Sequence, residues 1–557
     1  MGHNITASIE RSVWWGWGQE SHPRNIPPAV WPFLKREFGI VPSTQRKDPV
    51  PIDSVDVPPS ALEETVISEL MGILGSTNVK TDRHTRITHA SGKSYPDMYR
   101  LRTGNARHAP DAVLYPSTEE QIMQIFQAAE DHDLAVVPFG GGTSVVGGLE
   151  PLKNGKKAVV CIDMRRFNEL IHIDPVSNLA RVQAGMRGPE LEFALQRQGF
   201  TLGHIPQSHQ EATIGGYIAT RSAGQASTGY GRSDALVRGL TMVSPAGTIT
   251  LGNRAPSTAA GPQLMEALIG SEGTMGIITE ITLEVVEKPT HTEYASWAFA
   301  SWEQAATAFR RLYQECGPGM VPHVCRLSDE EETRDTLIMA GKIGQFLLKI
   351  LKARSMDTPC ISLFLWEDTN KSKAKYRKRI CERVLRAAGG KRLPKLLAEK
   401  WESGRFSGPY LRDALMSEGV LVDTLETATT WNNLNTVYRA VQEAIQQVGA
   451  QQGHKTLVQC HISHVYRSGA SLYYTFLTQE NEDPLAQWQA IKTAACQAIV
   501  AAGGTITHHH GVGRDHLPYV MPEFGYLGTQ ILSDMKARLD PHAILNPGKL
   551  IPALGNE

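Results

Sequence analysis

The chain has 557 residues, more than one domain core usually contains, so two or three domains are expected. Its 20% charged and 41% hydrophobic residues are typical of a globular protein. The 56 Lys and Arg residues nearly balance the 57 Asp and Glu residues, so no overall positive field exists to attract nucleic acid.

The cysteine pattern argues against a disulfide framework and against a zinc site. The seven cysteines are odd in number and scattered, and none forms a C-x-x-C pair, which is typical of reduced thiols in an intracellular protein. No apolar run approaches the ~20 residues that span a bilayer. The C-terminal Gly555, Asn556 and Glu557 do not resemble a peroxisomal signal. We expect a cytoplasmic protein, soluble or in peripheral contact with a membrane.

Residues 1–105 are expected to form an N-terminal helical and aromatic segment that packs on a larger body. The run Trp14-Trp15-Gly16-Trp17 lies near the start of the chain, and buried indole rings would anchor that segment. A helical pattern follows over residues 61–74 after a proline-rich stretch.

Residues 106–289 alternate short β-branched runs with helical stretches. Strands are expected over 135–138 and 158–162. A helix is expected over 118–132, with Thr118 as N-cap and acidic residues in its first turn. Such alternation predicts an α/β or α+β domain.

A glycine-rich loop, Pro138-Phe139-Gly140-Gly141-Gly142-Thr143-Ser144, directly follows the first of these strands. Three glycines remove every Cβ, so backbone N–H groups could converge on an anion such as a pyrophosphate. A tight structural turn is the alternative. The loop matches neither the P-loop pattern nor the dinucleotide-binding G-x-G-x-x-G pattern.

Four further motifs accompany this loop: Pro110-Asp111-Ala112-Val113, Thr213–Thr220, Gly270–Glu280 and Asn546-Pro547-Gly548-Lys549. Their order and spacing resemble the vanillyl-alcohol-oxidase superfamily. The resemblance implies an α+β protein with an FAD-binding domain over 106–289, a substrate-binding cap domain over 290–504, and a segment over 505–557 that returns to the FAD domain and active site. No histidine lies inside the glycine loop, so noncovalent FAD is expected. The implied cofactor-binding residues are Pro138, Phe139, Gly140, Gly141, Gly142, Thr143, Ser144, Gln207, Ser208, Thr213, Gly215, Gly216, Thr220, Gly270, Ser271, Glu272, Gly273, Thr274, Gly276 and Ile277.

An amphipathic helix is expected over residues 336–354. Met339, Ile343, Phe346, Leu347, Ile350 and Leu351 share one stripe, and three lysines fall off it. Such a helix either packs on a core or lies at a lipid interface.

The C-terminal third carries two histidine signatures, Cys460-His461-Ile462-Ser463-His464 and His508-His509-His510-Gly511-Val512-Gly513. Related D-2-hydroxy-acid dehydrogenases bind a divalent ion here through two histidines and a glutamate. This chain keeps His464, but Tyr473 and His509 replace the other two ligands. No metal is therefore expected.

These departures resemble the alkyldihydroxyacetonephosphate synthase family, whose C-H-x-S-H, Tyr and H-H-H-G-V-G pattern is intact here. The resemblance implies a redox-neutral exchange, in which a long-chain fatty alcohol replaces the acyl group of acyl-dihydroxyacetone phosphate through an adduct at flavin N5. A homodimer is expected. The alternative is an FAD-dependent oxidase or dehydrogenase of a 2-hydroxy acid.

The same resemblance implies catalytic roles for Tyr473, Arg326 and the three histidines His508, His509 and His510. Histidine suits proton removal beside a carbonyl, and which of the three is the base stays open. Arg412 is expected to bind the departing carboxylate or the phosphate. His464 is expected to bind substrate.

Overall fold

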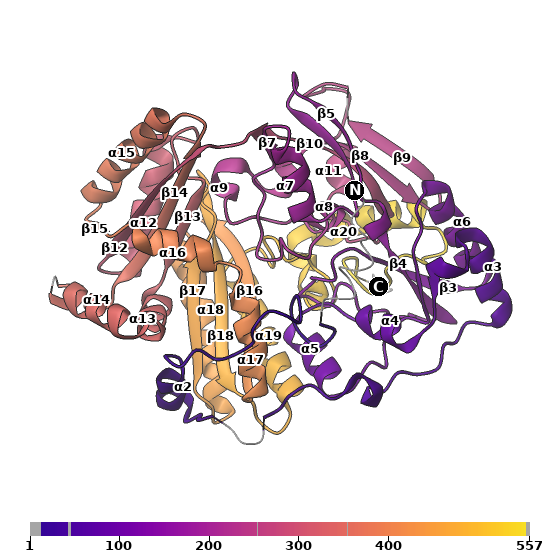
Figure 1. Cartoon of the computed structure of the whole chain (residues 1–557), viewed down its shortest axis with the longest axis horizontal. Helices are drawn as coiled ribbons and strands as arrows, with labels where there is room; N and C mark the ends of the chain where they lie inside the picture. The colour runs from indigo at the N-terminus through magenta and orange to yellow at the C-terminus, as the bar shows by residue number, and fades with distance from the viewer. Residues whose placement is uncertain (1–12, 43–45, 253, 354, 553–557) are drawn as a thin grey trace.

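A computed structural model describes residues 13–42, 46–252, 254–353 and 355–552. Figure 1 shows a large sheet with its helices on one side of the molecule and two smaller sheets on the other. The predicted α+β class is confirmed. Within the described residues, no helix is long and apolar enough to cross a bilayer.

The first small sheet contains the predicted strands and is parallel over most of its width. Its order is β1-β2-β4-β3, and β4 pairs in parallel with both of its neighbours. The predicted N-cap is confirmed, because Thr118 Oγ1 accepts a hydrogen bond from the N–H of Gln121. The elements are β1 (Val79–Lys80), β2 (Ala112–Leu114), β3 (Leu134–Phe139), β4 (Ala158–Asp163), α3 (Glu64–Leu74) and α6 (Glu119–Asp131).

The second small sheet is antiparallel and has the order β5-β6-β10-β8-β9. Loops and short helices between its strands carry the second and third glycine stretches. The elements are β5 (Leu170–Asp174), β6 (Leu179–Gln183), α7 (Gly188–Gln196), α8 (Ile214–Ala219), β8 (Val237–Ser244), β9 (Gly247–Gly252) and β10 (Ile277–Glu284).

The end of the chain returns to these two sheets. Leu545 pairs in parallel with Val136 of β3. The helix α20 (Met521–Leu539), yellow in Figure 1, packs Leu532 and Met535 against the core of the second sheet.

The large sheet is antiparallel and has seven strands in the order β15-β12-β14-β13-β17-β18-β16. Long helices cover it, and Trp297, Trp302 and Trp366 are among the largest fully buried side chains. Its elements are β12 (His291–Phe299), α12 (Trp302–Cys316), β13 (Val324–Ser328), β14 (Cys360–Asp368), α15 (Lys371–Ala387), β15 (Lys391–Leu393), β16 (Val420–Thr430), α18 (Leu434–Gln451), β17 (Thr456–Ile462), β18 (Gly469–Gln479) and α19 (Pro484–Ala501).

The helix predicted over 336–354 is not continuous. The chain forms α13 (Glu330–Met339) and α14 (Gly341–Ala353), separated where Gly341 adopts a φ of +69°. A left-handed residue cannot continue a right-handed helix, and glycine adopts that conformation without a Cβ clash.

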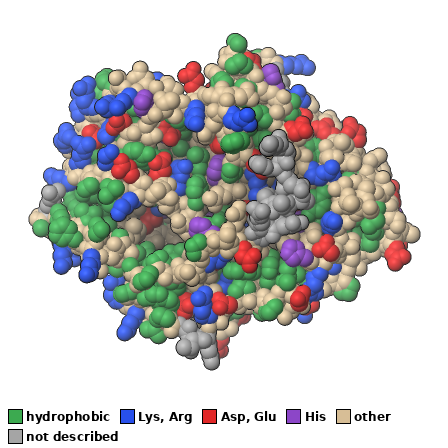
Figure 2. All heavy atoms as spheres, in the orientation of Figure 1, with side chains coloured by type: hydrophobic (Ala, Val, Ile, Leu, Met, Phe, Trp, Pro, Cys, Tyr) green, Lys and Arg blue, Asp and Glu red, His purple; other side chains and the backbone are tan. Residues whose placement is uncertain are grey.

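The apolar stripe of α14 is also divided. Leu351 is buried and Leu347 packs against the core, whereas Ile343 is 74% and Phe346 65% exposed. Figure 2 shows hydrophobic side chains flanked by Lys and Arg at the end of the molecule where α14 lies in Figure 1.

The described part of the N-terminal aromatic segment contacts the large-sheet region. Trp17 is buried, and its N–H donates to Asp413 Oδ2 at 2.7 Å. The Trp15 ring faces the guanidinium groups of Arg24 and Arg102. Residues 555–557, on which the expectation about a peroxisomal signal rests, lie outside the described residues.

Candidate active site and flavin cavity

The three glycine stretches meet around one cavity. The lining contains twelve of the expected cofactor residues together with His510. The twelve are Pro138, Phe139, Gly140, Ser144, Thr213, Gly215, Gly216, Thr220, Glu272, Gly273, Gly276 and Ile277.

The other expected cofactor residues do not line this cavity. Thr274 donates through Oγ1 to the carbonyl of Ser271, so the turn uses its hydroxyl internally. Gln207 accepts a hydrogen bond from Gln225. Six further residues line the cavity that were not among the expected cofactor residues: Gly148, Leu149, Met164, Ala184, Ala219 and Ile278. Ala219 and Ile278 lie inside the second and third glycine stretches, and the other four lie outside the motifs.

The backbone of the first glycine loop fits an anionic group. In the described part of the chain, no hydrogen bond uses the N–H groups of Gly140, Gly141, Gly142 or Thr143. A Cβ on Gly141 would lie 2.1 Å from the carbonyl oxygen of Glu211, and Gly142 has a φ of +70°. The loop therefore needs glycine, and its unused donors suit a pyrophosphate.

Glu272, in the third glycine stretch, joins the flavin cavity to the histidine loop. Its carboxylate accepts hydrogen bonds from the N–H groups of Val512 at 2.6 Å and Gly513 at 2.7 Å. Burial raises the pKa of Glu272 to about 7. Asn546 donates to the carbonyls of both Glu272 and Gly148, which fixes the C-terminal motif against the same cavity.

A buried carboxylate from β16 holds the triple histidine in place. Glu426 accepts hydrogen bonds from the backbone N–H groups of His508 at 2.7 Å, His509 at 2.9 Å and His510 at 2.9 Å. Burial alone would raise the Glu426 pKa, but the adjacent histidines and these donors hold it well below its usual range. Sequence reasoning missed Glu426 because it lies on a separate strand, with no motif around it.

The rings of His508 and His509 form a hydrogen-bonded chain with Tyr466. The Nδ1 atoms of His508 and His509 lie 2.9 Å apart, so one ring donates and the other accepts. His508 Nε2 lies 2.6 Å from the hydroxyl of Tyr466. Burial lowers the pKa of all three histidines, that of His509 to about 3, so the rings are neutral near pH 7.

Tyr473 on β18 meets this chain of rings. Its ring stacks on His461 at 4.8 Å between centroids and lies 6.0 Å from His509 and 5.5 Å from His510. Burial raises the pKa of Tyr473 to about 12, so the phenol keeps its proton at neutral pH. The structure thus brings the expected tyrosine and histidines together.

Arg326 on β13 reaches the same cluster through His461. Its Nη2 donates to Glu332 Oε1 at 2.6 Å and lies 3.1 Å from His461 Nδ1. The guanidinium is therefore paired with a carboxylate, which no sequence motif indicated.

Arg412 lies on α17 (Gly408–Ser417), away from the histidine rings. It donates through Nη1 to the carbonyl of Lys93 at 2.8 Å and through Nη2 to the sulfur of Met98 at 3.1 Å. The structure places it against the N-terminal segment rather than in the ring cluster.

Both ring nitrogens of His464 already have partners. Nε2 donates to the carbonyl of Gly224 at 2.6 Å, and Nδ1 lies 2.8 Å from Ser463 Oγ. The ring is 5.1 Å from His508. His464 thus connects the large sheet to the second glycine region.

Three groups of the cluster are spaced as metal ligands could be. One ligand atom each from Glu426, His508 and His509 lies within 4.8 Å of the others. The motif's glutamate position holds His509, as the sequence shows, but Glu426 brings a carboxylate to the cluster from another strand. Its carboxylate already accepts three N–H hydrogen bonds, which account for the proximity.

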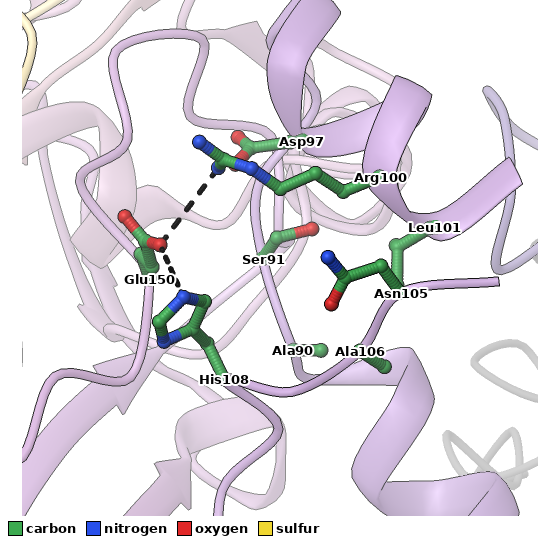
Figure 3. A pocket seen from close by; sticks show the side chains of 9 residues that line it. All are labelled: Ala90, Ser91, Asp97, Arg100, Leu101, Asn105, Ala106, His108 and Glu150. Carbon is green, nitrogen blue, oxygen red and sulfur yellow. Dashed lines mark ion pairs between the residues drawn. The ribbon is translucent and has the colours of Figure 1, made fainter. Parts of the chain in front are cut away.

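A second, smaller hollow is lined by side chains from residues 90–108 and by Glu150 (Figure 3). Arg100 and His108 both point at Glu150, with separations of 3.8 Å and 3.6 Å. Arg514, just beyond the histidine loop, pairs with the same carboxylate. The Arg514 pair ties the loop carrying Glu150 to the segment after the histidine loop.

Comparisons with known proteins agree with this arrangement. Residues 110–252 match the FAD-binding-domain family, and residues 288–550 match the C-terminal domain of FAD-linked oxidases. Alkyldihydroxyacetonephosphate synthase of Trypanosoma brucei brucei is 31% identical over 99% of this chain and 94% of that protein. The enzyme of the same name from Dictyostelium discoideum is 32% identical over 95% of this chain and 88% of its own length. A solved alkyldihydroxyacetonephosphate synthase superposes with a TM-score of 0.83 at 28% identity, covering 99% of this chain and 100% of that one.

Proposed function

Because the chain belongs to the alkyldihydroxyacetonephosphate synthase family, we propose that it exchanges the acyl group of acyl-dihydroxyacetone phosphate for a long-chain alcohol and forms an ether. The observation that carries this proposal is the meeting of Tyr473 with the triple histidine next to the flavin cavity. Bound FAD would supply the electrophile that holds the substrate carbon during the exchange.

His510 is the histidine best placed to take the proton beside the substrate carbonyl. It lines the flavin cavity, and its Nδ1 is buried without a hydrogen-bond partner in the described structure. That nitrogen lies 4.0 Å from Glu426 Oε1. A proton gained by the ring would therefore be stabilised by a carboxylate that is already fixed and ionised.

Tyr473 acts as a proton donor in this scheme because its raised pKa keeps the phenol protonated. Arg326 lies behind it, next to His461. Its guanidinium can orient the departing carboxylate, while Glu332 fixes the guanidinium itself.

An anaerobic absorbance titration tests the proposal. Palmitoyl-dihydroxyacetone phosphate should bleach the flavin of the purified protein, and hexadecanol should then restore the colour with release of ether product. No bleaching by this substrate would contradict the proposal.

A 2-hydroxy acid dehydrogenase is the second candidate, favoured by the closeness of Glu426, His508 and His509. It predicts flavin bleaching by D-lactate, strengthened by a divalent ion and lost with a chelator. The synthase proposal predicts no response to either treatment.

We also propose that α14 contacts a lipid surface. Ile343 and Phe346 are exposed beside Lys342 and Lys349, a combination suited to an interface with anionic lipid. Ile343→Glu with Phe346→Glu should abolish co-sedimentation with anionic liposomes. Val176→Glu, a change at a 91% exposed site on the other side of the molecule, should leave it unchanged. Equal binding by both variants would contradict the proposal.

A further inference from the structure

Tyr466 lies in the turn between β17 and β18 and contacts the histidine loop. Its backbone N–H donates to the carbonyl of Gly469 at 2.8 Å, and its carbonyl accepts from Trp431 Nε1 at 3.1 Å. Its hydroxyl lies 2.6 Å from His508 Nε2, which is a short hydrogen bond. The turn therefore holds the phenol in a fixed position against the His508 ring.

Arg232 determines which atom donates in this hydrogen bond. Its guanidinium donates to Asp234 at 3.0 and 3.1 Å and to the carbonyl of His508 at 3.0 Å. It also hydrogen-bonds the Tyr466 hydroxyl. A guanidinium carries only donors, so the phenol oxygen accepts from Arg232 and keeps its own hydrogen for another partner. Among the described residues, His508 Nε2 is the acceptor within reach of that hydrogen.

The direction of this first hydrogen bond sets the direction of the next one. A neutral imidazole has one N–H and one bare nitrogen. Because His508 accepts at Nε2, its hydrogen lies on Nδ1, which is 2.9 Å from the Nδ1 atom of His509. His509 must then accept at Nδ1 and carry its own hydrogen on Nε2.

Glu426 does not reverse this order. Its Oε2 lies 3.5 Å from His509 Nδ1, whereas the contact between the two histidine nitrogens is 2.9 Å. N–H···O hydrogen bonds usually measure ~2.7–3.2 Å, so the longer contact is the weaker one. The carboxylate also accepts the backbone N–H groups of the histidine loop already.

His509 and His510 thereby have different capacities. The bare nitrogen of His509 is used by His508, so its ring can donate from Nε2 but has no lone pair free for a substrate proton. His510 Nδ1 is buried without a hydrogen-bond partner in the described structure and remains able to accept. The two rings lie 4.7 Å apart, and His510 lines the flavin cavity. A donor and a base are therefore neighbours at this cavity.

We infer that Tyr466 is a positioning residue that fixes the tautomers of His508 and His509. The tyrosine thereby makes His509 a hydrogen-bond donor to a substrate oxygen and leaves the role of base to His510. This inference rests on the proposed function. When His510 takes the proton beside the carbonyl, the electron pair of the C–H bond moves towards the carbonyl oxygen. A preorganised N–H donor stabilises such developing charge.

Nitrogen NMR of the FAD-loaded enzyme with isotope-labelled histidine tests the tautomers, because a protonated ring nitrogen resonates far from a bare one. His509→Gln identifies the His509 signals by their loss. In the wild type, His509 should be protonated at Nε2 and bare at Nδ1, and Tyr466→Phe should move the hydrogen to Nδ1 in part of the molecules. Tyr376→Phe, at a 49% exposed site on α15, is the matched control and should leave these signals unchanged. A wild-type His509 protonated at Nδ1 would overturn the inference, even if Tyr466→Phe does not fold.

Kinetics separates positioning from direct contact with the substrate. Tyr466→Phe should lower kcat about tenfold, the effect of one hydrogen bond that no longer favours a tautomer, with KM little changed. His508→Asn keeps an N–H donor at the position of Nδ1 whether or not the phenol is present. Adding Tyr466→Phe to that variant should therefore have little further effect. An equal loss of kcat in both backgrounds, or a loss with unchanged His509 signals, would overturn the inference.

The spectra need no turnover, so this inference and the proposed function can fail separately. The expected tautomers in an enzyme that forms no ether would reject the function and leave the tautomer assignment standing. Ether formation by an enzyme whose His509 is protonated at Nδ1 would reject the inference and leave the function standing.

Discussion

Arg326 is paired with a carboxylate, whereas Arg412 has no carboxylate partner among the described residues. Arg326 donates to the carboxylate of Glu332, whose side chain is 12% exposed, and lies next to a histidine. Arg412 donates only to a carbonyl and a thioether, with Lys93 as its neighbour. An arginine that is paired with a carboxylate mainly stabilises the folded protein, whereas an arginine without such a partner is available to bind an anionic ligand. The two arginines thus have different surroundings.

The largest expected effect is that of Arg412→Met on substrate use. Removing a cation from a charged ligand weakens binding by ~2–5 kcal/mol, so kcat/KM should fall about 10³-fold, mainly through KM. Arg326→Met should act mainly on kcat, because its proposed role is with the departing acid. Steady-state kinetics on both variants measures this difference. If both variants changed kcat and KM in the same way, the two arginines would not have the separate roles proposed here.

For the free energy of unfolding we expect the reverse order: the Arg326–Glu332 pair should matter more than Arg412. Burial raises the Glu332 pKa, but Arg326 and His461 outweigh burial and hold it at about 2. Relative to an ordinary value near 4.3, this shift corresponds to about 3 kcal/mol of stability, present above pH 4.3 and lost as pH falls towards 2. Glu332→Gln should therefore lower the free energy of unfolding by about that amount at pH 7 and by less near pH 3.

Denaturant unfolding at the two pH values measures this difference. Glu331→Gln is the matched control, because Glu331 pairs with Arg334 at the surface and should contribute less than ~1 kcal/mol. Arg412→Met should unfold like the wild type, since no ion pair is lost. A pH-independent effect of Glu332→Gln would show that the pair contributes packing rather than charge.

Tyr473 lies between the two regions, against His461 and within reach of the Arg412 charge. Tyr473→Phe should reduce kcat about 100-fold, the lower end of the range for proton transfer, with KM little changed. Because the phenol pKa is about 12, the wild-type rate should show no loss from its ionisation below pH 10. Rapid-mixing kinetics across pH 6–10 checks both points. They would be contradicted if the wild-type rate changed with a pKa near 8 and Tyr473→Phe abolished that change.

The smallest expected effect is a pH dependence of KM that arises from Lys93, beside Arg412. Lys93, with a pKa of about 8 that burial lowers, loses its charge as pH rises from 7 to 9. The phosphate itself does not titrate there, because its second pKa is near 6. KM for the acyl donor should therefore rise about fivefold over this range. Lys93→Arg should flatten the rise, and an unchanged slope in that variant would assign the pH dependence to another group.

Local patterns predicted the local structure well. The N-cap at Thr118 and the strand before the glycine loop follow from neighbouring residues. The break at Gly341 was missed because the apolar stripe continues through it, and periodicity does not report φ.

The candidate site was predictable only where residues form a motif. Tyr473 and the triple histidine could be found in this way, and the structure brings them together. Glu426 and Lys93 could not, because their roles depend on contacts across 82 and 319 residues of chain. Whether an arginine is paired is likewise invisible until the fold places its carboxylate.

The parallel pairing of Leu545 with β3 has a consequence for biosynthesis. The glycine loop follows β3, yet the Leu545 neighbour of that strand and the Asn546 contact to Glu272 come from a segment that is synthesised long after the loop. The flavin cavity therefore cannot be completed while those residues remain in the exit tunnel. We expect flavin capture to wait until this segment has emerged, so that translation stalled before Leu545 yields a colourless nascent chain.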